Sequence, residues 1–88
     1  MLAAPPAERG VSTARAALLA LLAERAPGAS LCPSEVARRL AGPEGDWRAE
    51  MAAVHAAVDA LAQEGVIGLS WKGRPMAKRR GPYRIARR

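Results

Sequence analysis

Basic side chains crowd the C-terminal end of the chain, where their spacing suits them to bind a polyanion. Residues 66–88 contain no acidic residue and eight basic ones, namely Lys72, Arg74, Lys78, Arg79, Arg80, Arg84, Arg87 and Arg88. This segment carries +8 and residues 1–65 carry −2, which together give the net charge of +6. Guanidinium and ammonium groups bind phosphate oxygens, and the glycines and prolines among them would let a phosphate backbone approach closely. The pattern predicts contact with the backbone of a nucleic acid.

Residue types that support catalysis or metal binding are sparse. Cys32 and His55 are single copies of their types, so we expect neither an internal disulfide nor a zinc site with several Cys or His ligands. Cys32 precedes an expected helix, where a redox-active thiolate is conceivable and a buried structural thiol is commoner. His55 could contact a phosphate or titrate near neutral pH, and a half-exposed packing role is commoner. We expect no enzyme, no metal and no cofactor.

The length allows one small domain with a thin core. The chain has 88 residues, and 21 residues of its apolar half are alanines. No apolar run reaches the roughly 18–20 residues that span a bilayer, and the first residues lack the pattern of a secretory signal, so we expect a cytoplasmic protein. Residues 1–11 are predicted to be a disordered lead-in and residues 12–88 the domain.

Two helices are predicted in the first half of the chain. The first extends from Ser12 or Thr13 to Ala26, because apolar residues recur on one face and Pro27-Gly28 stops it. Its inward face comprises Ala14, Leu18, Leu21 and Leu22. The second spans residues 33–40 and begins with a proline, which suits the first helical position.

A third helix is predicted between the N-cap Asp46 and Gly65. Its inward stripe comprises Trp47, Met51, Val54, Val58 and Leu61. Its opposite face comprises Arg48, Ala49, Ala52, His55, Ala56, Asp59 and Gln63. Residues 46–65 contain one Arg and four acidic residues, a net −3, which weighs against direct reading of bases by this helix. The Ala-rich opposite face could instead admit another helix, so a dimer or partner interface is an open alternative.

Alternation with period two follows the third helix. Ile67, Leu69 and Trp71 fall on one side of a predicted strand, which is half-buried with Trp71 facing inward. A long basic loop over residues 73–81 leads to a second alternating stretch at residues 83–85. The fold class is therefore α+β, mainly helical, and the arrangement is a winged helix-turn-helix, in which three helices precede a β-hairpin wing.

Several segments, taken in order, resemble one bacterial family. They are Leu31-Cys32-Pro33-Ser34-Glu35-Val36-Ala37-Arg38, Asp46-Trp47-Arg48, Gly65-Val66-Ile67, Lys72-Gly73-Arg74-Pro75 and Arg80-Gly81-Pro82-Tyr83-Arg84-Ile85. Over about residues 14–85 the chain is similar to domain of unknown function 3253, a family of small winged-helix-like proteins. The resemblance implies this fold and carries no reaction or ligand. Members tend to have basic residues near the positions of His55 and Asp59, so this chain departs from the family where a nucleic-acid contact would matter.

Together these observations favour a winged-helix module that binds duplex nucleic acid, namely duplex DNA, and has a role related to transcription. The residues expected to contact nucleic acid are Arg48, His55, Lys72, Arg74, Lys78, Arg79, Arg80 and Arg84. Arg79 and Arg80 are expected to clamp a phosphate, because no acidic residue lies near them in the sequence. The alternative is a protein-interaction or dimerisation module built on the third helix. A membrane surface is disfavoured because the basic segment has no adjacent apolar anchor, and no small-molecule ligand is evident.

Overall fold

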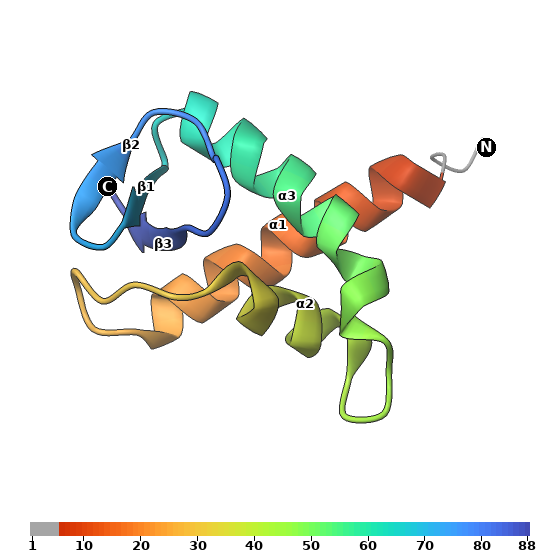
Figure 1. The fold of residues 1–88 in the computed structure, drawn as a ribbon. Helices are drawn as coiled ribbons and strands as arrows, with labels where there is room; N and C mark the ends of the chain where they lie inside the picture. The colour runs from red at the N-terminus through yellow and green to blue at the C-terminus, as the bar shows by residue number, and fades with distance from the viewer. Residues whose placement is uncertain (1–5) are drawn as a thin grey trace.

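A computed structural model describes residues 6–88, which form three helices followed by a small antiparallel sheet (Figure 1). The elements are α1 (Pro6–Glu24), α2 (Pro33–Ala41), α3 (Trp47–Gln63), β1 (Ile67–Trp71), β2 (Arg74–Met76) and β3 (Arg84–Arg87). The predicted class, α+β and mainly helical, is confirmed. The order of the elements is that of a winged helix-turn-helix.

Helix α1 begins earlier than its sequence pattern predicts. It starts at Pro6, since a proline fits the first helical position, where its missing N–H costs nothing. Gly10 lies inside the helix, and a Cβ at this position would be 3.5 Å from the Cβ of Ala53, so α1 passes close to α3 there. Val11 packs against the core. The expected lead-in is thus helical from Pro6 onwards, and its residues 1–5 lie outside the described residues.

Helices α2 and α3 begin at the predicted caps. The Oε2 atom of Glu35 accepts a hydrogen bond of 2.7 Å from the backbone N–H of Cys32, next to Pro33 at the first position of α2. The Oδ1 atom of Asp46 accepts one of 3.1 Å from the backbone N–H of Arg48 at the start of α3. These bonds satisfy donors that lack partners within the helix and set the direction in which each helix leaves its loop.

The sheet has the strand order β2-β1-β3, and both pairings are antiparallel. Lys72 and Gly73 join β1 to β2, and both have positive φ, 51° and 79°, as a type I′ turn requires. The single basic loop predicted over residues 73–81 is therefore wrong: it contains this tight turn and β2, and the longer connection runs from residue 77 to residue 83. Leu31, in the segment after α1, forms an isolated β-bridge with Ile85 of β3.

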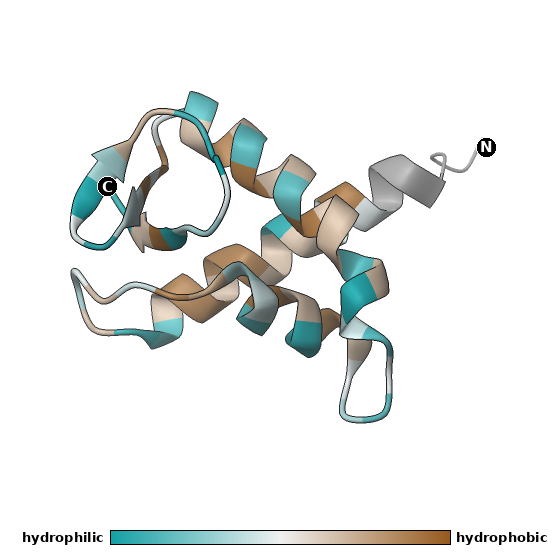
Figure 2. Ribbon diagram, in the orientation of Figure 1, coloured by the Kyte–Doolittle hydropathy of each residue, from teal (hydrophilic) through white to brown (hydrophobic). Residues whose placement is uncertain are grey.

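One hydrophobic core lies between the helices and the sheet. Its largest fully buried side chains are Leu18, Leu31, Leu61, Ile67, Ile85, Val36, Val54 and Val58. Figure 2 shows apolar residues gathered where the helices face one another, and hydrophilic residues along the hairpin and the loop that follows it. Three predicted inward positions are not fully buried. Trp71 is 39% exposed because β1 ends there, at the hairpin turn. Met51 is half-buried, and so is Trp47, beside two arginines.

Candidate nucleic-acid interface

The basic residues of the sheet region form two groups on the surface. Lys72 and Arg74 flank the turn between β1 and β2, and both are exposed. Lys78, Arg79 and Arg80 are exposed on the loop that leads from β2 to β3, which we call the wing loop (residues 77–83). The structure thus presents five of the predicted phosphate ligands to solvent.

The wing loop is attached to α3 by an ion pair. The Nε atom of Arg79 donates a hydrogen bond of 2.8 Å to Oδ1 of Asp59, which lies on the outward face of α3. The expectation that no acidic residue neutralises this part of the loop is therefore wrong for Arg79. Asp59 is 20 residues away in the sequence, and only the packing of the loop on α3 brings the two together.

A second contact between the wing loop and α3 joins His55 and Tyr83. Nδ1 of His55 is 2.7 Å from the hydroxyl oxygen of Tyr83, and the two rings are tilted by 50°. Burial lowers the pKa of His55, the Arg79 cation lowers it further, and Asp59 opposes both effects. Burial also raises the pKa of the Tyr83 hydroxyl. His55 is thus held uncharged near neutral pH, which suits it to anchor the loop better than to bind a phosphate as a cation.

Arg84 and Arg87 are turned to internal contacts. The Nε and Nη2 atoms of Arg84 donate to the hydroxyl and the carbonyl oxygen of Ser30 at 2.9 and 3.1 Å. Nη2 of Arg87 donates to the carbonyl oxygen of Leu22 at 2.7 Å. These contacts tie β3 to α1 and to the segment after it. Arg84, expected to contact nucleic acid, is half-buried, and its geometry favours a structural role.

The negative charge predicted for the region of α3 is partly neutralised by other elements. Arg79 pairs with Asp59, and Arg15 of α1 pairs with Glu64 through bonds of 2.7 and 2.8 Å. The pair with Arg15 lowers the pKa of Glu64, so this carboxylate stays ionised and paired. Counting the two arginines with residues 46–65 changes the local charge from −3 to −1. The electrostatic objection to a phosphate backbone near α3 is accordingly weaker than the sequence suggests.

Arg48 at the start of α3 is held against Trp47 instead of pointing freely into solvent. Its guanidinium carbon lies 4.5 Å from the centroid of the Trp47 ring, and that of Arg38, on α2, lies 4.6 Å from the same centroid. No sequence signal links Arg38 to Trp47. The neighbouring Arg39 forms an ion pair with Glu24, at 2.8 Å.

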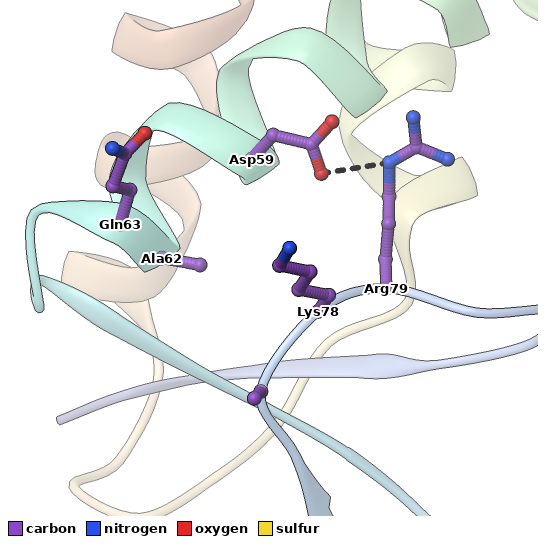
Figure 3. Close-up of a pocket in the computed structure, with 6 residues that line it drawn as sticks. Asp59, Ala62, Gln63, Lys78 and Arg79 are labelled. Carbon is purple, nitrogen blue, oxygen red and sulfur yellow. Dashed lines mark hydrogen bonds and ion pairs between the residues drawn. The ribbon is translucent and has the colours of Figure 1, made fainter.

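A cleft of about 600 Å³ separates the C-terminal half of α3 from the wing loop (Figure 3). It is lined by Asp59, Ala62, Gln63, Ala77, Lys78 and Arg79. Lys78 extends from the loop into this space, and no hydrogen bond or ion pair joins its ammonium group to any residue from 10 to 88. The cleft therefore combines an available cation with a neutralised pair at its rim.

Other kinds of site find no support in residues 10–88, whose side chains the structure describes. No three His, Cys, Asp or Glu side chains in this part of the chain are grouped so that they could hold a metal ion. None of its helices combines the length and the apolar character needed to cross a membrane.

Two comparisons bear on the identity of the chain. The family model described as "Protein of unknown function (DUF3253)" matches residues 12–88. No curated protein matches the chain.

Proposed function

Given that the chain belongs to the DUF3253 family, whose function is unknown, we propose from the geometry that it binds duplex nucleic acid through its wing. The contact surface consists of the wing loop, the β1–β2 turn and the adjoining outward face of α3. The protein acts in this proposal as a cytoplasmic binding module and not as an enzyme. A role in transcription would fit a module of this kind.

The proposal rests on the location of the positive side chains that have no acidic partner. Four arginines are paired with acidic residues in the described part of the chain, namely Arg15, Arg25, Arg39 and Arg79, and of these Arg79 alone lies on the wing loop. Lys72, Arg74, Lys78 and Arg80 are exposed, and among the side chains of residues 10–88 none of them has an acidic partner. Cations without internal partners are the ones that can neutralise phosphates without first breaking an ion pair.

Helix α3 is proposed to add contact without much base discrimination. Its outward face offers three exposed alanines, Ala49, Ala52 and Ala56, which make no hydrogen bonds to base edges. Arg48 is the one cation on this face, and it is held by Trp47 at the N-terminal end. Binding is therefore expected to depend on the phosphate backbone and to vary little with the sequence of the duplex.

A pair of double variants with the same charge tests the proposal. Lys78→Ala with Arg80→Ala removes two unpaired cations of the wing loop, and Arg15→Ala with Arg39→Ala removes two cations that are paired elsewhere. In mobility-shift titrations with a duplex of random sequence at low salt, we expect the first variant to lose retention and the second to bind like the parent. For about three to five phosphate contacts, the parent should show a slope of log K against log salt of about −3 to −4.5. Equal binding by both variants would refute the wing as the contact surface.

The alternative is a second copy of the chain packed on α3. The exposed alanines would allow close helix packing, and Ala56→Glu would then abolish assembly. Sedimentation velocity over a range of concentrations decides this: a mass that rises with concentration and falls to the monomer in Ala56→Glu supports the dimer, and a monomer at all concentrations excludes it.

A further inference from the structure

The end of the β1–β2 hairpin presents an uncovered indole ring. Trp71 is 39% exposed, and the one other large apolar residue with comparable exposure in residues 6–88 is Leu19 on α1, at 36%. Trp47 shows the contrasting arrangement, because two guanidinium groups lie over its ring. No such group lies over Trp71 in the described part of the chain. The indole of Trp71 thus leaves a large apolar surface exposed to solvent at the hairpin end, although its burial would be favourable.

The hairpin turn brings two cations close to Trp71, one along the chain and one across the strand pair. Lys72 follows Trp71 directly, and Arg74 is opposite Trp71 in the antiparallel pairing of β1 with β2. Both cations are exposed, and residues 66–88 contain no acidic residue that could pair with them locally. The hairpin end, defined here as residues 71–74, therefore combines an aromatic face with two available cations.

The backbone of the turn adds an independent observation. Lys72 is the one non-glycine residue in the described part of the chain with positive φ, at 51°. Asn and Gly adopt this conformation more readily than Lys, and a type I′ turn favours them. A residue kept in an unfavourable conformation suggests that its side chain is needed at that place. At Lys72 the side chain supplies charge beside the indole.

We infer that the hairpin end is a stacking site for an unpaired nucleobase, with Trp71 against the base and Lys72 and Arg74 on the neighbouring phosphates. Aromatic rings stack on any base, and flanking cations follow the backbone of a single strand. The site would let the protein bind single-stranded nucleic acid or the unpaired end of a duplex. This activity goes beyond the proposed duplex binding. It shares Lys72 and Arg74 with the surface proposed for duplex DNA, but it requires Trp71 and not the wing loop.

The test uses ten-nucleotide oligothymidylate as the single-stranded probe and reads the intrinsic tryptophan fluorescence. In Trp47→Phe, where Trp71 is the remaining indole, we expect the probe to quench the emission at low salt. In Trp71→Phe the affinity, followed by anisotropy of a labelled probe, should be largely kept because phenylalanine also stacks, and the quenching should be lost. Trp71→Ala should weaken binding of the probe by about 5- to 150-fold. Leu19→Ala removes the other exposed apolar side chain and should bind like the parent.

Specific results would overturn the inference. Equal affinity of Trp71→Ala and the parent for oligothymidylate, with circular dichroism showing that both are folded, excludes stacking on Trp71. Quenching of Trp71 by vesicles of anionic phospholipid and not by the oligonucleotide would assign the hairpin end to a membrane surface instead. Binding of oligothymidylate that depends on Trp71, without binding of a blunt duplex, would uphold this inference and refute the proposed function, so the two fail separately.

Discussion

Removing the ion pair between Asp59 and Arg79 is predicted to strengthen nucleic-acid binding, whereas most substitutions in a binding surface weaken it. If the wing loop binds phosphate, Asp59 competes with the nucleic acid for Arg79, whose Nε lies 2.8 Å from the carboxylate. Asp59→Asn removes this competition and one negative charge from the outward face of α3. We therefore expect the variant to bind duplex DNA more tightly than the parent.

The structure sets the size of the effect. The side chains of Asp59 and Arg79 are 52% and 38% exposed, so the pair is screened by solvent and contributes about 0.2–1 kcal/mol. Binding that no longer has to break the pair gains the same amount, which corresponds to about 1.4- to 5-fold in affinity. Because Arg79 binds phosphate in the parent and in the variant, the number of phosphate contacts is the same, and the slope of log K against log salt should stay unchanged.

Fluorescence anisotropy with a labelled duplex, repeated at several salt concentrations, measures both quantities. Glu24→Gln is the matched control, because it removes the same charge and releases Arg39 on the side of α1 and α2, away from the wing loop. Tighter binding in Asp59→Asn alone supports the reasoning. If the two variants bind alike, or if Asp59→Asn steepens the salt slope by about 0.9, Arg79 does not exchange Asp59 for a phosphate in the parent.

Two predictions concern stability. Burial lowers the pKa of His55 below its unfolded value, so the stability that the uncharged imidazole contributes is complete above pH 6.5 and is lost as the pH falls through the lower folded value. Urea unfolding from pH 8 to pH 5 should therefore show a steeper loss of the free energy of unfolding in the parent than in His55→Gln, and equal slopes would contradict this. Leu18→Ala should lower the free energy of unfolding by about 2–5 kcal/mol, because Leu18 is fully buried, whereas Leu19→Ala should lower it by less than about 1 kcal/mol. Similar losses for the two variants would show that Leu18 does not lie in the core.

Much of the fold follows from local patterns. The inward faces of α1 and α3 follow from the 3.6-residue period, and Leu18, Val58 and Leu61 are buried as predicted. The starts of α2 and α3 follow from Pro33 with Glu35 and from Asp46, since a cap acts through hydrogen bonds over two or three residues. Such signals are contained within one turn of helix and can be read without knowing what the helix packs against.

The sequence predictions are wrong at positions whose structure depends on contacts with distant parts of the chain. Alternation placed Trp71 on the inward side of β1, but burial also requires other side chains to cover that point, and β1 ends there. β2 was missed because Arg74-Pro75-Met76 has no alternation of its own, and the pairing with β1 makes it a strand. Helix α1 starts earlier than predicted because Gly10 fits inside the helix, where α1 passes close to α3.

The segregation of charge was determined by the sequence alone, because the number of ionisable groups in a segment does not depend on how it folds: residues 66–88 carry +8 in any conformation. The tertiary structure decides which of those cations have no internal partner and can therefore bind a polyanion. Asp59 binds Arg79, Ser30 binds Arg84, and Lys78 is left without a partner among residues 10–88. The two contacts join residues 20 and 54 positions apart in the chain, and no local pattern reports them, since they exist only once the helices and the sheet have packed together.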